Sequence, residues 1–534
     1  MTFTQWFIFF LIIQVVHFVG TWKLYIKAER KAWEAIIPIY NAVVLMKIIK
    51  RPWWWVILLF IPIVNLLMFP VVWIETIRSF GRVSRLESFL VIITLGLYIF
   101  YVNYFLDVSY NLERSLKPRS GLGEWVSSIV FAVIAATLVH TYIMQPYVIP
   151  SSSLEKTLLV GDFLFVSKFH YGARVPMTTV AFPMVHDTIP VVKNKSYLFD
   201  DRVEEKETSW KNWFQLPYLR IPAFEKIKRN DIVVFNQPAD TLLDMNDFYP
   251  DRTYYKPVDK KTNLVKRAVG IAGDSLQIKD GYIYINGERT TYTDRAKIQY
   301  NFFVNTQGKT ISQSALEKRY GAREGLRDRN GNFALTNQGG YMLTLTDAEA
   351  DRISKNPVVV EVTKLLRPKG TPGDVFPHKS GLRWNIDNFG PIYIPKKGAT
   401  VPLDRESLPF YERIIREYEN NNLIVVGDDI LINGKLADSY TFKQDYYWMM
   451  GDNRQNSLDA RKWGYVPFNH VVGKPVFIWF SWETNGTSFM EKIRWDRLFT
   501  TVGGEGKPIS YFKYFLIALA AWFIFSFFRK RRKK

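Results

Sequence analysis

Five apolar stretches stand out along the chain, and each is close to the length needed to cross a lipid bilayer. A membrane-spanning helix takes roughly 20 consecutive apolar residues. The pattern predicts about five such helices, three of them in an N-terminal membrane module (1–123), one as an anchor (124–144) and one at the C-terminus (511–534). The apolar stretches cover about residues 3–22, 52–74, 89–106, 125–144 and 511–528.

The region between the fourth and fifth stretches has a different pattern, in which short apolar runs alternate with turn signals. Asn286-Gly287 and Asn433-Gly434 are dipeptides favoured in two-residue hairpins. We expect a mainly β, antiparallel domain built from 145–289 and 421–510. Its clearest strands are DIVVF (231–235), YIYI (282–285), LIVV (423–426), DILI (429–432) and VFIWF (476–480).

Residues 290–420 interrupt this β pattern. Ser314 with Glu317 and Thr346 with Glu349 have the spacing of capping boxes that open short helices. VVVEV (358–362) predicts a strand, and a further helix is expected at 405–419. We interpret 290–420 as an inserted α/β subdomain with hairpins.

The distribution of lysine and arginine predicts the orientation in the membrane, because cytoplasmic loops are enriched in both. Seven of them lie in the 23–51 loop and none before the first span, which places the N-terminus outside. The first span lacks a basic start and a small-residue cleavage site, so we expect an anchor and not a removable signal peptide. The 107–123 loop and the C-terminal RKRRKK (529–534) belong in the cytoplasm. Four crossings then place 145–510 outside, although three arginines in the 75–87 loop also fall on that side.

Composition excludes several classes of chemistry. The net charge of +20 arises largely from basic loops and the basic tail, which suit anionic lipid better than nucleic acid. The chain has no cysteine, so disulfides and thiolate catalysis are excluded. Its six histidines show neither metal-ligand spacing nor the company of a Ser-His-Asp triad. We expect no metal and no cofactor.

Serine with lysine is the catalytic pair that remains. Three serines follow Pro150, just after the fourth apolar stretch. A lysine that acts as general base must be neutral, which requires burial to lower its pKa by about 3 units. Lys266 satisfies this demand best, because Leu264, Val265 and Ala268 surround it in a strand-like run. Lys156 is the second candidate, in a more polar setting.

Four sequence blocks follow the fourth apolar stretch in a fixed order. They are IPSSSLEKTLLVGDFLFVSK (149–168), RNDIVVF (229–235), KRAVGIAGD (266–274) and MGDNRQNSLDARKWGYVP (450–467). Together they closely resemble type I bacterial signal peptidases, the Ser/Lys dyad family. This resemblance implies a signal-peptidase-like antiparallel β fold and an endopeptidase that removes signal peptides from exported preproteins. The activity is expected at the outer face of the bacterial cytoplasmic membrane.

By position, the resemblance implies that Ser153 is the nucleophile and Lys266 the general base. Ser151 corresponds to the hydroxyl that joins the nucleophile's amide in stabilising the oxyanion, and Ser457 to the serine that orients the lysine. Asp452 with Arg267, and Asp459 with Arg461, correspond to supporting ion pairs. The family binds signal peptides as an added strand, with small residues at the first and third positions before the cut. Residues Ile149, Leu264 and Val265 are expected to line the pockets for these small side chains.

The chain departs from the family pattern at four positions, and these leave other functions open. Ser152 replaces a glycine, Leu154 a methionine, and both Lys156 and Ala272 a proline. An inactive membrane scaffold and a Ser/Lys endopeptidase with narrow substrates are therefore alternatives. The segment at 35–55 resembles a small bacterial membrane module often fused to such peptidases. We expect it to lie as an amphipathic segment at the inner interface.

Overall fold

The computed structural model describes residues 1–118, 120–238, 255–378, 380–483 and 488–531. The chain divides into two compact units. The first contains 1–144, 172–222 and the described part of 240–262, and the second contains 145–171, 223–238 and the described residues from 263 onward. Residues 172–222, which the sequence prediction counted with the catalytic domain, therefore cluster with the N-terminal helices.

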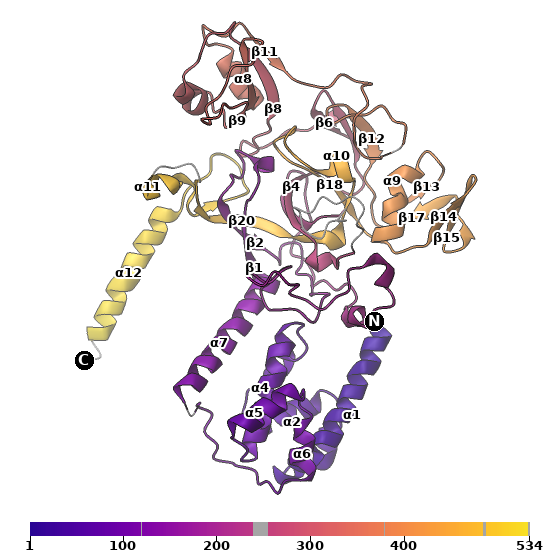
Figure 1. The fold of residues 1–534 in the computed structure, drawn as a ribbon, viewed down its shortest axis with the longest axis vertical. Helices are drawn as coiled ribbons and strands as arrows, with labels where there is room; N and C mark the ends of the chain where they lie inside the picture. Colours follow the sequence, from indigo (N-terminus) through magenta and orange to yellow (C-terminus); the bar gives the residue numbers. More distant parts are fainter. Residues whose placement is uncertain (119, 239–254, 379, 484–487, 532–534) are drawn as a thin grey trace. The chain divides into compact units, whose positions relative to one another are not determined.

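The first unit is a group of helices, drawn in indigo and violet in Figure 1. Thr2 caps its first helix through a capping box with Gln5. Short 3-10 turns follow in its later segments, at Val203–Glu205, Trp210–Phe214 and Val258–Lys260. The helices are α1 (Phe3–Lys27), α2 (Tyr40–Ile48), α3 (Trp55–Leu58), α4 (Val64–Ser79), α5 (Arg85–Ile93), α6 (Tyr98–Tyr104) and α7 (Gly121–Leu138), with a 3-10 turn at Ala32–Ala35 and a π turn at Val139–Ile143 that extends α7.

Three described helices are long and apolar enough to cross a membrane, namely Phe3–Lys27, Gly121–Ile143 and Phe512–Arg529. The pair α5 and α6 passes the same test only as a unit, and it is bent by 119° at its break. The expected span at 52–74 is divided between α3 and α4, which begins after Ile63 with φ 69°. The prediction of about five membrane-spanning helices is therefore not supported, because backbone breaks divide the second and third apolar stretches, at 52–74 and 89–106.

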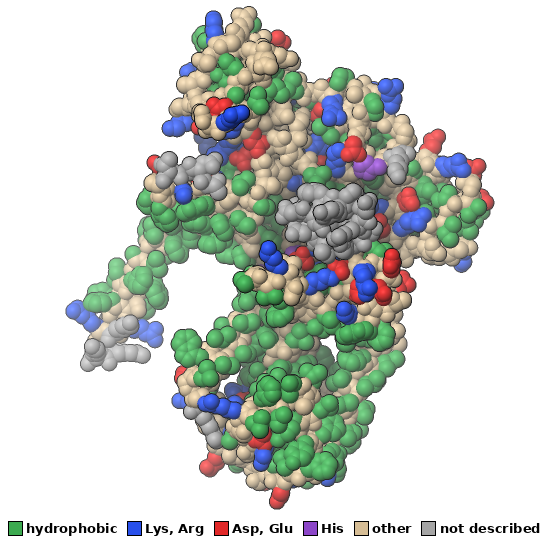
Figure 2. Space-filling view, in the orientation of Figure 1, with side chains coloured by type: hydrophobic (Ala, Val, Ile, Leu, Met, Phe, Trp, Pro, Cys, Tyr) green, Lys and Arg blue, Asp and Glu red, His purple; other side chains and the backbone are tan. Residues whose placement is uncertain are grey.

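Apolar side chains cover much of the surface of the N-terminal helices. Figure 2 shows hydrophobic residues in green over this unit. Phe7, Ile12, Phe89 and Leu95 are examples with at least half of their surface exposed. Exposed apolar surface of this extent suits lipid. Inside the unit, the buried carboxylate of Glu75 accepts hydrogen bonds from both Arg51 and Arg114, so this charge is paired.

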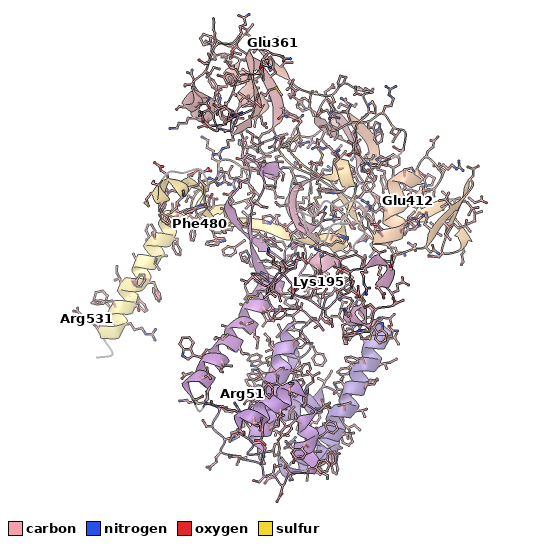
Figure 3. All side chains as sticks on the ribbon, in the orientation of Figure 1. Arg51, Lys195, Glu361, Glu412, Phe480 and Arg531 are labelled. Carbon is pink, nitrogen blue, oxygen red and sulfur yellow. The ribbon has the colours of Figure 1, made fainter. Side chains whose placement is uncertain are left out.

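The second unit contains the main sheet, in the strand order β1-β2-β20-β3-β4-β18-β19 with β21 paired to β20. Its pairs β2–β20, β20–β3, β3–β4, β4–β18 and β18–β19 are antiparallel. Figure 1 shows β2 beside the long strand β20, and Figure 3 labels Phe480 on β20. The strands are β1 (Met144–Val148), β2 (Asp162–Ser167), β3 (Ile232–Asn236), β4 (Asn263–Gly270), β18 (Tyr446–Met450), β19 (Val466–Pro467), β20 (Val471–Ser481) and β21 (Thr500–Thr501).

Four smaller sheets complete the unit, in the orders β12-β5-β6-β7, β11-β8-β10-β9, β13-β17 and β14-β15-β16. The two predicted hairpins are confirmed, since Asn286 and Asn433 both have positive φ at the turns after β6 and β15. The strands are β5 (Ser275–Lys279), β6 (Tyr282–Ile285), β7 (Glu288–Arg289), β8 (Tyr300–Asn305), β9 (Glu324–Gly325), β10 (Gly340–Leu345), β11 (Glu361–Lys364), β12 (Phe389–Tyr393), β13 (Thr400–Pro402), β14 (Leu423–Val426), β15 (Asp429–Ile432), β16 (Lys435–Leu436) and β17 (Ser439–Thr441).

Of the expected capping boxes, Thr346 with Glu349 forms and opens α8, whereas Ser314 makes no capping hydrogen bond. The helix expected at 405–419 is confirmed as α9 and a following π turn. The helical elements are α8 (Asp347–Ile353), α9 (Leu408–Arg413), α10 (Ala460–Trp463), α11 (Phe489–Lys492) and α12 (Phe512–Arg531), the π turns Ala315–Arg319 and Ile414–Tyr418, and the 3-10 turns Ser152–Leu154, Phe468–His470 and Trp495–Arg497.

Separate apolar cores stabilise these parts. One cluster joins Ile149, Leu154 and Val234 of the main sheet, and another contains Phe235 and Ala268. The sheet β11-β8-β10-β9 has a core of its own, which includes Phe302, Leu343 and Ile353 of α8. We call residues 300–364, which carry this sheet and α8, the β8–β11 region. It lies in the sequence between β7 and β12, two strands of one other sheet.

Candidate active site

Ser153 and Lys266 lie together in the structure, although 113 residues separate them. Lys266 belongs to β4, an inner strand held by β3 on one side and β18 on the other. Ser153 belongs to the short 3-10 turn Ser152–Leu154 that follows β1. The Nζ of Lys266 lies 2.5 Å from the Oγ of Ser153. This separation is within the reach that proton transfer between the two groups requires.

Burial of Lys266 raises the share of its neutral form above that of an ordinary lysine. Its side chain is 5% exposed, and Ser153 is 7% exposed. Burial lowers the pKa of Lys266 to about 8, while the carboxylates of Asp459 and Asp452 act in the opposite direction. A charged group loses hydration when it is buried, so the neutral amine gains relative to the ammonium ion. About one molecule in ten would therefore hold a neutral Lys266 at pH 7.

Lys156 has a different partner. Its Nζ lies 2.5 Å from Oε2 of Glu349, and both side chains are largely buried. Burial lowers the pKa of Lys156, and the carboxylate of Glu349 raises it. A carboxylate at this distance stabilises the ammonium form. Lys156 thus forms an ion pair with Glu349 of α8, whereas the hydroxyl of Ser153 contacts Lys266.

Two buried ion pairs lie beside the dyad, at the residues expected from sequence. Arg267 donates two hydrogen bonds to Asp452, from Nε at 2.7 Å and Nη2 at 2.6 Å. Arg461 donates two to Asp459, at 2.9 and 2.8 Å. Burial opposes ionisation of Asp452, but Arg267 outweighs it and lowers the pKa of that carboxyl. Paired, bidentate geometry of this kind holds neighbouring backbone segments rigidly.

The two remaining expected residues differ in their environment. Ser151 is exposed and precedes the 3-10 turn, and its hydroxyl makes no capping hydrogen bond. Ser457 has a buried hydroxyl without a hydrogen-bond partner, so the expected contact with Lys266 is absent from this structure.

Sequence reasoning missed Gly451. A Cβ at this position would overlap Oγ of Ser457 and lie 2.5 Å from the carbonyl oxygen of Ser153. Its amide also donates to Oδ2 of Asp459 at 3.1 Å. Only glycine lets this backbone approach Ser153 so closely. The sequence signal for this glycine was its place directly before Asp452 and Asn453, in the block at 450–467.

The structure separates the three residues expected to line apolar pockets. Ile149 and Val265 pack in the same cluster, together with Leu154. Leu264 packs against the second cluster, beside Phe235 and Ala268. Neighbouring residues of a strand point to opposite faces, so Leu264 and Val265 do not share a face of β4. Ile149 and Val265 are therefore the pair that shares one surface.

Three of the four departures from the family pattern have local explanations, whereas nothing in the structure explains Ala272. Ser152 begins a 3-10 turn and is not among the residues with positive φ, so a side chain is accommodated there without backbone strain. Leu154 is buried in the apolar cluster of Ile149. Lys156 has φ 67°. The ring of proline fixes φ near about −65°, so a proline could not adopt the backbone conformation observed at position 156.

The sequence also matches known protein families. The model described as "Signal peptidase, peptidase S26" matches residues 122–336 and 403–482, more than half of the chain. The chain belongs to the signal peptidase family. Membership makes it a serine protease that acts as a signal peptidase. A second model, described as a family of unknown function (DUF5684), matches residues 33–112.

Curated relatives agree with this assignment. The chain is 25% identical to Signal peptidase I of Buchnera aphidicola (subsp. Acyrthosiphon pisum) over 72% of this chain and 84% of the relative. It is 23% identical to Signal peptidase I of Helicobacter pylori (strain 26695), over 72% and 93%. For Signal peptidase I of Haemophilus influenzae the identity is 22%, over 73% and 78%. The similarity extends over most of the length of these relatives.

Proposed function

We propose that Ser153 and Lys266 form the catalytic dyad with which this signal peptidase cleaves signal peptides from exported preproteins. The observation that carries the proposal is the 2.5 Å contact between Nζ of Lys266 and Oγ of Ser153. Burial of the lysine, with its pKa lowered to about 8, supports the role of base. The intact pair favours an enzyme over an inactive scaffold.

Acylation follows from this geometry. Neutral Lys266 takes the proton of Ser153, and Oγ attacks the carbonyl carbon of the scissile bond. The tetrahedral intermediate collapses as the ammonium of Lys266 gives its proton to the leaving nitrogen. The mature protein leaves with a free amino group, and the signal peptide stays as an ester on Ser153. Lys266 is neutral again at the end of this step.

Hydrolysis of the ester repeats the same proton movements with water. Lys266 takes a proton from the water as its oxygen attacks the ester carbonyl, and returns a proton to Oγ of Ser153. Negative charge develops on the carbonyl oxygen in both steps. The backbone amide of Ser153 and the hydroxyl of Ser151 are the donors that we assign to it. The ion pairs of Asp452 and Asp459 keep these groups in position.

The preference for small residues before the cut is assigned to the surface of Ile149 and Val265. These two side chains pack in one apolar cluster beside the nucleophile turn. Small side chains of an added substrate strand would contact this surface, whereas large ones would not fit. No cofactor or metal takes part in this scheme.

We further propose that the chain spans the bacterial cytoplasmic membrane three times, with 145–510 on the outer side. Under five spans, the 75–87 loop with Arg78, Arg82 and Arg85 would lie outside. With α1, α7 and α12 as the spans, this loop lies inside, together with the 23–51 loop and the basic tail. Figure 3 labels Arg51 and Arg531, which mark two of these basic regions. The bent pair α5 and α6 would then return to the side from which it enters.

The absence of cysteine makes this topology directly measurable. Ser84→Cys and Ser439→Cys each introduce one exposed thiol into a cysteine-free chain. A membrane-impermeant thiol reagent should label Ser439→Cys in intact spheroplasts, and Ser84→Cys only after permeabilisation. Labelling of Ser84→Cys in intact spheroplasts would favour the five-span topology.

Cleavage of a purified preprotein in detergent tests the dyad. Ser153→Ala should abolish cleavage, because no other group supplies the nucleophile. Ser439→Ala is the control, at an exposed serine of β17 that takes no part in the site, and should retain activity within about threefold. Equal activity of wild type and Ser153→Ala would contradict the dyad and favour a different nucleophile.

A further inference from the structure

A cavity of about 550 Å³ begins at the residue before the nucleophile. Ser152 lines it from the nucleophile turn, and Asn456 from the loop after β18. The β8–β11 region supplies the other walls, with Asn301, Arg323, Glu324, Leu326, Met342 and Thr344 among the lining residues. Volumes of this size accommodate ligands of several residues. The proposed mechanism of the dyad does not use this cavity.

The cavity is formed by one face of the sheet β11-β8-β10-β9. Along β10, Tyr341, Leu343 and Leu345 are buried in the core of the β8–β11 region. The alternate residues Met342 and Thr344 therefore point to the opposite face. Asn301 is the partner of Thr344 in the antiparallel register and accepts a hydrogen bond from it at 2.9 Å. The same sheet thus has one apolar, buried face and one face of mixed polar and apolar side chains that lines the cavity.

The three residues of the nucleophile turn lie in three environments. Leu154 is buried in the apolar cluster with Ile149 and Val265, and Ser153 contacts Lys266. Ser152 lines the cavity. A polypeptide whose scissile carbonyl lies at Ser153 extends away on both sides of that serine, by about 3.3 Å for each residue. If the cluster of Ile149 and Val265 receives the signal peptide, the cavity is on the path of the residues beyond the cut.

Direct contacts connect the cavity wall to the catalytic loop. Glu324 accepts hydrogen bonds from Nδ2 of Asn453 at 2.5 Å and from Nδ2 of Asn456 at 2.8 Å. The backbone amide of Asn453 donates to the carbonyl oxygen of Ser153 at 3.1 Å. Arg323 lies 3.4 Å from Glu155, next to the turn. The wall is therefore held in a fixed position relative to the nucleophile.

We propose that this cavity binds the first residues of the mature polypeptide, the segment that follows the scissile bond. The inference rests on the proposed dyad. Strand β9 is the last strand in its sheet order, and an extended peptide is recognised at a sheet edge through its backbone, whatever its sequence. That suits substrates whose mature sequences differ. The lining combines polar side chains, such as Asn301 and Thr344, with apolar ones, such as Leu326, so it can contact polar and apolar residues alike.

Two peptide substrates that share a signal-peptide segment test the proposal. One ends two residues after the cut, and the other continues for ten. The wild-type enzyme should cleave the long substrate with a kcat/KM about tenfold higher, equivalent to 1.4 kcal/mol of binding. Met342→Trp, which fills the cavity, should remove this preference by raising KM for the long substrate. Val360→Trp is the control, at an exposed position beside β11 on the other edge of the sheet, where Figure 3 labels Glu361.

Product inhibition of the wild-type enzyme gives a measurement that does not depend on any variant. A decapeptide with the mature N-terminal sequence should inhibit cleavage of the long substrate competitively, whereas its N-terminal dipeptide should not. An unchanged preference for the long substrate in Met342→Trp, or no inhibition by the decapeptide, would overturn the proposal. Cleavage of the short substrate by Ser153→Ala would instead overturn the dyad, so the two failures are distinguishable.

Discussion

The surroundings of Lys266 and Lys156 give the most instructive comparison in this molecule. Both amines are buried near the nucleophile, and burial lowers the pKa of both. Lys156 is three residues from Ser153 in sequence, yet its amine pairs with Glu349. Lys266 comes from a distant strand and contacts the hydroxyl of Ser153. The partner of a buried amine, and not its distance along the chain, decides whether it can serve as a base.

Removing each amine separately should give the largest difference. Lys266→Met should lower kcat/KM by roughly 10⁴-fold or more, the usual consequence of removing a catalytic base from a nucleophile and base pair. Lys156→Met should lower it by less than about tenfold, because that amine does not contact the nucleophile. Steady-state cleavage of a preprotein in detergent measures both. A larger loss in Lys156→Met than in Lys266→Met would reverse the assignment.

Changing the backbone beside Lys266 should have the next largest effect. Gly451→Ala places a methyl group against the carbonyl oxygen of Ser153 and the side chain of Ser457. The nucleophile turn must move to accommodate it, and a displacement near 1 Å costs about 100-fold in rate. Gly503→Ala is a matched control, since nothing lies within 4 Å of a Cβ there. Full activity of Gly451→Ala would show that this close approach is not required.

Breaking the Lys156 ion pair should affect stability more than rate. Glu349→Gln leaves a buried ammonium without its carboxylate and should destabilise the protein by about 3 kcal/mol. The double variant Lys156→Met with Glu349→Gln should recover most of that loss, because no charge stays buried. Thermal unfolding of Lys156→Met, Glu349→Gln and the double variant measures the coupling free energy between the two side chains. Equal destabilisation in Glu349→Gln and the double variant would show that the pair contributes nothing specific.

Local features of the fold followed directly from sequence. The alternation in YIYI and DILI predicted β6 and β15, and the Asn-Gly dipeptides predicted their hairpins. Each of these depends on neighbours within a few residues. The ion pair of Lys156 joins residues 193 positions apart, so no local pattern indicates it. The break before α4 includes the positive φ of Ile63, a conformation that isoleucine seldom adopts. Pro62, which directly precedes it, was the available signal in the sequence.

The candidate site was predictable in its residues but not in its geometry. The four sequence blocks indicated Ser153 and Lys266, and the structure places them in contact. The cavity beside Ser152 depends on how the β8–β11 region packs against the loop of Asn453 and Asn456. Side-chain packing between segments distant in sequence determines such a surface. It becomes visible only when the fold is known.

The pH dependence of acylation in single-turnover experiments tests the central claim most directly. Lys266 is active only when neutral, so activity should be lost as the pH falls through its pKa of about 8. The rate constant for acylation should rise about tenfold per pH unit below that value and level off above it. The same midpoint in Lys156→Met would confirm that Lys266 is the base. A midpoint near 10.4, the ordinary value for lysine, or one that changes in Lys156→Met, would contradict the account.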